Sequence, residues 1–183
     1  MQKPQTTVFA PLDEHCQRVT QGVITVGGIA TLPALFLSLS GRFESDIGLY
    51  GAVLSAVVAG VFLVGIGVAY AAMPVSLELG ADALVVRRRW FRPIVVPYTH
   101  IEAVTTMPVG NDWHSEGWAL SAGLFGYQGR YRSTRTGRCM AIATDRDRMV
   151  AIARRDAPML VVSPLLPHAC VNALREQLAK KDS

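Results

Sequence analysis

The residues that could carry out chemistry are few and scattered. The four histidines stand at positions 15, 100, 114 and 168, and no two have the His-x-x-x-His spacing that places metal ligands on one helical face. The chain contains no Gly-rich phosphate loop followed by Lys and no Gly-x-Ser-x-Gly elbow. In the densest polar cluster, Asp112-Trp-His-Ser-Glu116, His114 and Ser115 would have to act as base and nucleophile. Adjacent residues on a strand or loop point apart, so we expect no enzyme and no metal or cofactor site.

The cysteines also argue against a metal or disulfide framework. Cys16, Cys139 and Cys170 are odd in number and far apart in the sequence. Cys170 falls within an apolar pattern of helical spacing, which predicts a small buried hydrophobic residue.

The clearest chemical feature is a basic run, Arg87-Arg-Arg-Trp-Phe-Arg92. Each cation near an anionic leaflet contributes about 1 kcal/mol, and this attraction fades over about 8–10 Å. On a strand Arg87 and Arg89 point away from Arg88, so one headgroup cannot meet all four arginines. The alternative interpretation is a solvated strand edge whose charges prevent aggregation and set membrane topology.

A second basic set, Arg130, Arg132, Arg135 and Arg138, lies in a Gly-rich stretch. Tryptophans near this stretch suit contact with a partner or a membrane surface. The candidate lipid-binding or partner-binding residues are Arg87, Arg88, Arg89, Arg92, Trp113, Trp118, Arg130 and Arg132. Nucleic acid is not expected as a partner, because the net charge is only +4 and the chain has a membrane anchor.

That anchor consists of two apolar runs, at residues 22–40 and 47–73, separated by a short polar link. Between residues 22 and 73 the only charges are Arg42, Glu44 and Asp46. About 20 helical residues cross a hydrocarbon core of about 30 Å, so both runs are long enough. We therefore predict a transmembrane hairpin at 22–73, preceded by a cytoplasmic segment at 1–21. Tyr50 and Tyr70 lie near the ends of the second span, as interfacial anchors do.

The Lys and Arg residues predict the orientation. The link carries one, Arg42, whereas Lys3, Arg18 and the basic run flank the hairpin. Positive residues stay inside, so we place both termini in the cytoplasm and the chain in the inner membrane. The second span also has a small residue at every fourth position: Gly48, Ala52, Ala56 and Gly60. This stripe allows close approach either by the first span or by another helix, as in a homo-oligomer or a complex.

From residue 74 the pattern changes to period two, which predicts short strands. We expect strands at 75–79, 83–90, 94–97 and 101–107, and a loop or two bent short strands at 111–129. Further strands are expected at 139–144, at 149–154 as its hairpin partner, and at 159–163. An amphipathic helix follows, with Cys170, Val171, Leu174 and Leu178 on its apolar face. The fold class is therefore α+β, with a bent antiparallel sheet or barrel over 74–183 that the terminal helix caps.

This arrangement resembles the bacterial pleckstrin-homology-like (PH-like) domains. The similarity rests on Leu77-Glu-Leu-Gly-Ala-Asp-Ala-Leu-Val-Val86, on Val96-Pro-Tyr-Thr-His-Ile101, on the Gly-rich stretch 124–137, and on Val161-Val-Ser-Pro164 before the last helix. A membrane hairpin ahead of such a domain is a common layout in these proteins. The resemblance implies a fold and an interaction role, and it carries no ligand.

Together these patterns predict a membrane-anchored, non-catalytic module whose domain binds a protein partner or the inner leaflet. The alternative is an accessory or assembly subunit that docks in a membrane complex through its helices. An enzyme is a remote third possibility.

Overall fold

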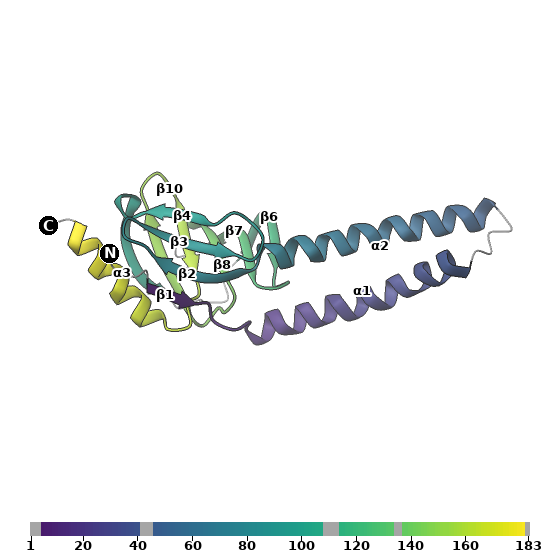
Figure 1. Ribbon diagram of the computed structural model, residues 1–183, viewed down its shortest axis with the longest axis horizontal. Helices are drawn as coiled ribbons and strands as arrows, with labels where there is room; N and C mark the ends of the chain where they lie inside the picture. The colour runs from purple at the N-terminus through teal and green to yellow at the C-terminus, as the bar shows by residue number, and fades with distance from the viewer. Residues whose placement is uncertain (1–4, 41–45, 108–113, 134–136, 182–183) are drawn as a thin grey trace.

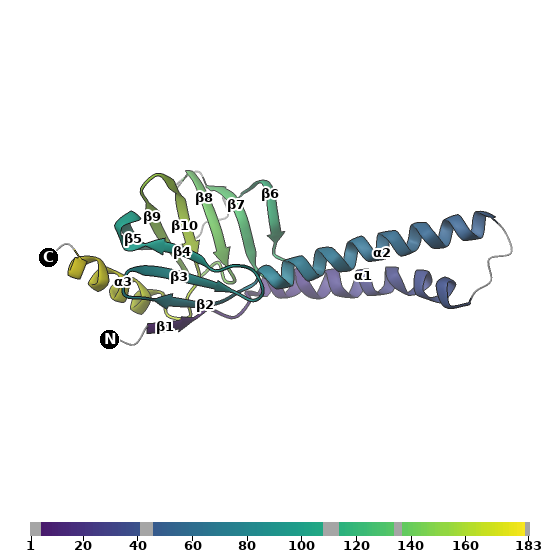
Figure 2. The same cartoon turned by 45° about the horizontal axis from the view of Figure 1, so that its top comes forward.

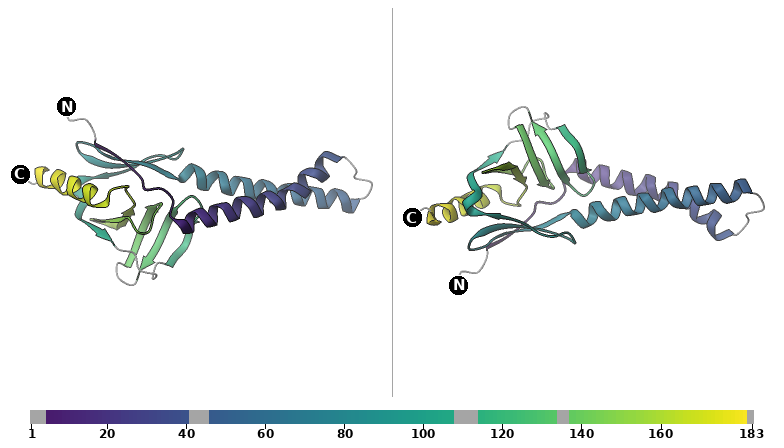
Figure 3. Two further views of the ribbon diagram at one scale, coloured as in Figure 1. Left: turned by 90° about the horizontal axis from the view of Figure 1, so that it is seen from below. Right: turned by 90° about the horizontal axis from the view of Figure 1, so that it is seen from above.

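The computed structural model describes residues 5–40, 46–107, 114–133 and 137–181. Two long helices, α1 (Glu14–Ser40) and α2 (Asp46–Ala72), project side by side from a folded domain of strands and one further helix (Figure 1). They run antiparallel and stay close in views from two further sides (Figure 3). A Cβ added at Gly27 of α1 would overlap the ring of Phe62 of α2, so glycine allows this close contact.

The helices are apolar, and many of their apolar side chains are exposed. Among the described residues one helix, Leu49–Ala72, is long and apolar enough to cross a membrane, and little of it is buried. α1 also exposes large apolar side chains, among them Val26, Ile29 and Phe36. Water penalises such exposure, so this surface suits a lipid environment. One span thus meets the length and hydropathy criteria, and the second remains a prediction from sequence.

The domain contains a four-stranded antiparallel sheet with the order β1-β2-β3-β4. These strands are β1 (Gln5–Val8), β2 (Pro74–Leu79), β3 (Ala83–Arg88) and β4 (Ile94–Pro97). Alternate residues such as Leu77, Leu84 and Val86 point into the core, as the period-two pattern predicts. β1 comes from the N-terminal segment and pairs with β2 across the hairpin insertion. Residues 5–8 therefore belong to the same folded domain as the chain after the helices.

The second sheet has six strands in the order β5-β9-β10-β8-β7-β6 (Figure 2). They are β5 (Ile101–Met107), which follows a 3-10 turn at Tyr98–His100, then β6 (His114–Ala122), β7 (Tyr127–Ser133), β8 (Gly137–Ala143), β9 (Met149–Arg154) and β10 (Ala157–Val162).

The predicted hairpin between strands 139–144 and 149–154 is wrong. β10 lies between them, parallel to β8 and antiparallel to β9. The tight hairpin is instead β9–β10, whose two-residue turn Arg155–Asp156 places Asp156 at a φ of +59°. Aspartate tolerates this left-handed conformation better than most residues other than glycine.

The α+β class is confirmed, but the sheet is neither one barrel nor wholly antiparallel. The described residues form two separate sheets, and one strand pair among them is parallel. The terminal helix α3 (Pro167–Lys181) buries Cys170, Val171 and Leu174 in the core, as its spacing predicts. The PH-like fold and the transmembrane placement of the hairpin remain predictions.

Candidate membrane-facing site

The end of α2 is fastened to the turn between β3 and β4. The backbone N–H of Arg89 donates to the carbonyl of Met73 at 2.9 Å, and that of Trp90 donates to Ala71 at 3.0 Å. The last carbonyls of a helix have no partner within it, so this turn satisfies two groups at the helix end. As a result Trp90 lies at the level where the apolar helix stops.

Aromatic rings and an arginine gather around Tyr70 at this joint. Arg89 Nη1 donates to the Tyr70 hydroxyl at 2.7 Å, and its guanidinium lies 4.4 Å from the ring centroid. The Tyr70 ring meets Trp90 and Phe125 edge-on, at centroid distances of 5.7 and 5.3 Å. Trp90 is 73% exposed and Phe91 39%. Exposed aromatic rings beside arginine at a helix end are typical of a membrane interface.

Three arginines of the basic run are engaged within the protein. Arg87 pairs with Glu78, and this hydrogen bond raises the pKa of Arg87. Arg88 donates to the carbonyl of Arg92 from Nε at 3.0 Å and from Nη2 at 2.6 Å. Partial burial lowers the pKa of Arg88. Arg89 is held by Tyr70 in the same way. These three side chains therefore stabilise the turn and have little freedom to bind a lipid headgroup.

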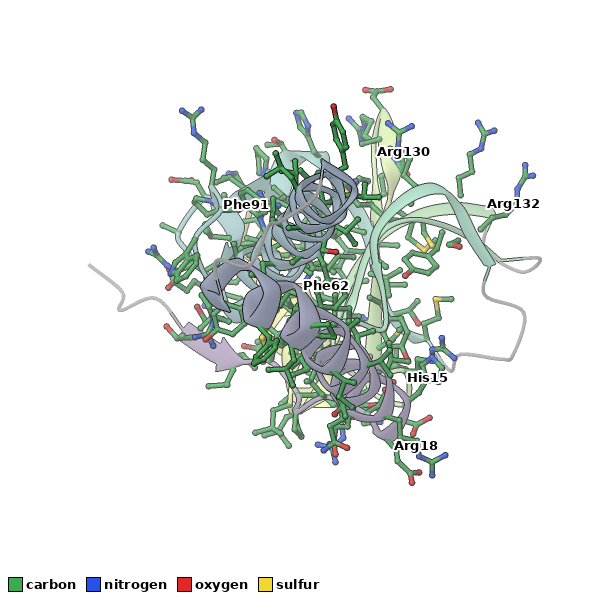
Figure 4. The ribbon with its side chains drawn as sticks, turned by 90° about the vertical axis from the view of Figure 1, so that its right-hand side faces the viewer. His15, Arg18, Phe62, Phe91, Arg130 and Arg132 are labelled. Atoms are coloured by element: carbon green, nitrogen blue, oxygen red, sulfur yellow. The ribbon has the colours of Figure 1, made fainter. Side chains whose placement is uncertain are left out.

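The remaining site residues belong to the turn before β4 and to strands β6 and β7. Arg92 and Arg130 are exposed, and within the described part of the chain neither takes part in a salt bridge. Figure 4 looks along the hairpin from its loop end and shows Phe91 and Arg130 on either side of α2, with Arg132 farther out among the strands. Trp118 belongs to β6, the strand beside β7. Trp113 lies outside the described residues.

The start of α1 is fixed to the domain through Asp13, which caps the helix. Its Oδ1 accepts from the Cys16 backbone N–H at 2.7 Å. Its Oδ2 accepts from the Tyr127 hydroxyl at 3.0 Å and from the Arg146 backbone N–H at 3.2 Å. Burial alone would raise the pKa of this carboxyl, but these hydrogen bonds outweigh it and the pKa is lowered.

The β6–β7 loop, residues 123–126, is wedged between the two helices. The Thr20 hydroxyl accepts from the Phe125 N–H at 3.1 Å, while the Phe125 ring meets Tyr70. Gly126 has a φ of +124°, and a Cβ there would stand 2.7 Å from the Ala143 carbonyl, so only glycine fits. Both helices are therefore positioned by the same domain.

The sequence analysis did not predict that Asp13 and Arg89 fix the two helices to the domain. Asp13 immediately before a helical run is a known N-cap signal and was available. The pairing of Arg89 with Tyr70 joins residues 19 apart through a turn geometry that no local pattern encodes.

The small-residue stripe of α2 is divided between two environments. Ala52 is buried, whereas Ala56 is exposed and Gly60 has open space around it. Gly48 lies on the same helix, in the part whose side-chain environment is not described. The contact with α1 instead involves Phe62, so Ala56 and Gly60 remain available to another helix.

The cysteines provide no reactive thiol. All three are free and buried, and burial raises the pKa of Cys16 to about 12 and that of Cys170 to about 11. A neutral, enclosed thiol is a poor nucleophile. Among residues 5–40, 46–107, 114–133 and 137–181, no group of three His, Cys, Asp or Glu side chains is arranged to hold a metal ion.

No protein-family model, curated protein or solved structure matches the chain. The similarity to PH-like domains therefore rests on the sequence motifs alone.

Proposed function

We propose that this chain is a membrane-anchored, non-catalytic module. Its two long helices cross the inner membrane as a hairpin with both termini in the cytoplasm. They hold a PH-like domain against the inner leaflet, where the domain binds anionic lipid headgroups. The observation that carries this proposal is the pair of backbone hydrogen bonds that joins the Arg89–Trp90 turn to the end of α2.

Those hydrogen bonds fix the position of the domain relative to the end of the membrane-spanning helix. A spanning helix that ends at Ala72 leaves the hydrocarbon near that residue, and Trp90 is bonded one residue earlier, at Ala71. Trp90 and Phe91 then lie at headgroup level, where amphipathic rings are favoured. Rigid docking means that the domain does not swing freely on a linker.

The charges at this level favour an anionic leaflet. Arg92 and Arg130 are exposed. We propose that both face the leaflet, where each contributes about 1 kcal/mol near an anionic surface. Two such residues supply about 2 kcal/mol, which is about a thirtyfold preference over a neutral surface.

The test uses the full chain, because β1 and the Asp13 cap belong to the domain and a fragment starting at residue 74 would lack them. The chain is placed in nanodiscs of neutral or partly anionic lipid, and hydrogen exchange is followed by mass spectrometry. Anionic lipid is expected to protect the 89–93 turn and β7.

An Arg92→Ala/Arg130→Ala variant should lose this protection. An Arg155→Ala/Lys180→Ala variant, which removes the same charge from exposed positions far from the basic run in sequence, should keep it. Equal exchange of the wild type in both lipids would refute lipid binding.

A second candidate function is that of an accessory subunit that docks through α2. The open surface at Ala56 and Gly60 favours it, because small residues allow close helix contact. Under this proposal Ala56→Leu abolishes copurification of a membrane partner, whereas Val57→Leu on the neighbouring exposed surface does not. Unchanged copurification with Ala56→Leu would exclude this interface.

A further inference from the structure

The strand β6 has an open edge. It is the last strand of the six-stranded sheet and pairs with β7, and no further strand among the described residues lies beyond it. An edge strand leaves the backbone N–H and C=O groups of alternate residues without partners in the sheet. On β6 these groups must therefore be satisfied by water or by a partner from outside the sheet.

The loop that follows β6 fixes the level of this strand along the hairpin. Thr20 of α1 binds the loop through its hydroxyl, which accepts from the Phe125 N–H at 3.1 Å and donates to the Gly123 carbonyl at 3.4 Å. On the other side the Phe125 ring meets the ring of Tyr70 of α2, with the centroids 5.3 Å apart. Thr20 lies two residues before the apolar run of α1, and Tyr70 lies two residues before the end of the candidate span of α2. The loop therefore lies where the apolar part of both helices ends.

The direction of β6 keeps the whole strand near this level. Figure 2 shows β6 as the strand of its sheet nearest the helices, running across their direction, with β7, β8 and β10 successively farther away. Figure 1 shows the same order. The open edge of β6 thus faces the side from which the helices project. The opposite edge strand, β5, is five strand spacings away, about 24 Å along the sheet.

This position selects what covers the edge. With the helices across the membrane, the contact between Phe125 and Tyr70 holds β6 next to the hydrocarbon boundary. An open sheet edge does not lie in hydrocarbon, because its backbone groups would find no hydrogen-bond partners there. A partner strand added to β6 would lie about 4.8 Å farther towards the hydrocarbon, and its own open edge would then face the lipid tails. Headgroups avoid this problem, because phosphate oxygens accept hydrogen bonds from backbone N–H groups.

From these features we propose that β6 is the strand through which the domain rests on the membrane. Its open edge lies in the phospholipid headgroup layer, where its free N–H groups donate to phosphate oxygens and its free carbonyls bind headgroup water. This rests on the membrane anchoring proposed above, but not on the binding of anionic lipid by Arg92 and Arg130. The bilayer then shields the edge that other proteins cover with a helix or a loop.

The test uses the full chain in lipid nanodiscs, with a nitroxide spin label on one introduced cysteine at a time. Ser115 of β6 and Thr105 of β5 are a matched pair, because both are exposed hydroxyl-bearing residues on opposite edge strands of the same sheet. The native cysteines are buried, and the unsubstituted chain controls for labelling at them. The Ser115→Cys label should be several-fold less accessible to a water-soluble nickel chelate than the Thr105→Cys label. The difference should be the same in neutral and in anionic lipid, because it depends on position and not on charge.

Equal accessibility of the two labels would overturn the proposal. A Ser115→Cys label that is shielded in native membranes but accessible in nanodiscs of pure lipid would also overturn it, because a protein would then cover the edge. Carbonate extraction of the membranes separates this inference from the proposed function. A chain released by carbonate refutes the anchoring itself, whereas an integral chain with equally accessible labels refutes only the contact through β6. The Arg92→Ala/Arg130→Ala variant should keep the shielding at Ser115 even where the preference for anionic lipid is lost.

Discussion

Removal of the Asp13 carboxylate should uncouple α1 from the domain and destabilise both. In the Asp13→Ala variant the helix loses its cap, and the Tyr127 hydroxyl and the Arg146 N–H lose their acceptor. In Asp13→Asn the cap remains, because Asn is as good an N-cap as Asp. In this variant the Tyr127 hydroxyl can donate to the amide oxygen of the new side chain, so the Arg146 N–H is the main group left without an acceptor.

The magnitude follows from these contacts. A lost N-cap costs about 1 kcal/mol, and a partly buried group left unpaired costs about 1–3 kcal/mol. Because these groups are only partly buried, we take about 1 kcal/mol for each. Asp13→Ala loses the cap and two acceptor contacts and should lower the free energy of unfolding by about 3 kcal/mol, whereas Asp13→Asn leaves one N–H unpaired and should lower it by about 1 kcal/mol.

The carboxylate also predicts a pH dependence. Because folding lowers the pKa of Asp13, the ionised form is the one that stabilises the fold. Its contribution is complete above the unfolded pKa of about 4 and is lost as pH falls through the lower folded value. The stability difference between the wild type and Asp13→Asn should therefore be constant from neutral pH down to about 5 and shrink below about 4.

Urea unfolding of the full chain in detergent micelles measures this, because all three tryptophans, at positions 90, 113 and 118, follow the hairpin. With a slope of about 2 kcal/mol/M, Asp13→Ala should lower the midpoint by about 1–2 M. A shift below about 0.3 M, or a wild-type advantage that persists unchanged at low pH, would refute the assigned role of Asp13.

Three pairs of substitutions test packing and backbone geometry. Gly27→Ala should destabilise the hairpin by about 1–3 kcal/mol, because the added methyl group overlaps Phe62. Gly28 has open space around it, so Gly28→Ala should be neutral or stabilising by up to about 1 kcal/mol. The resistance of the two variants to SDS in mixed micelles compares their stabilities. Thr144→Val leaves a buried backbone carbonyl without its donor and should cost about 1–3 kcal/mol in urea unfolding, with most of the loss recovered in Thr144→Ser. Asp156→Gly should raise the melting temperature because it relieves about 1 kcal/mol of left-handed strain, and Asp156→Val should lower it.

The spacing of apolar residues predicted which faces of the strands and of the last helix are buried. The alternation of Leu77, Leu84 and Val86 identified buried strand faces, and the spacing of Cys170 and Leu174 identified the apolar face of α3. Pairing between distant strands could not be predicted in this way. The insertion of β10 beside β8 depends on which strand edges meet after folding, and no residue spacing encodes that.

The same limit applies to the candidate site. The sequence identified the basic run, but the side-chain partners determine which cations are free. Arg87 and Arg89 find Glu78 and Tyr70 only once β3 lies beside β2 and its following turn meets the end of α2. A run of arginines that looks uniform in sequence therefore divides into three whose side chains have a partner within the protein and one, Arg92, whose guanidinium has none among the described residues.

We propose that the hairpin holds the domain at the cytoplasmic face of the membrane. Reporter fusions at residue 45 and at residue 183 measure the membrane topology and so test this proposal. The fusion at 45 is expected to report from the periplasm and the fusion at 183 from the cytoplasm. A cytoplasmic signal at 45, or a periplasmic signal at 183, would contradict it.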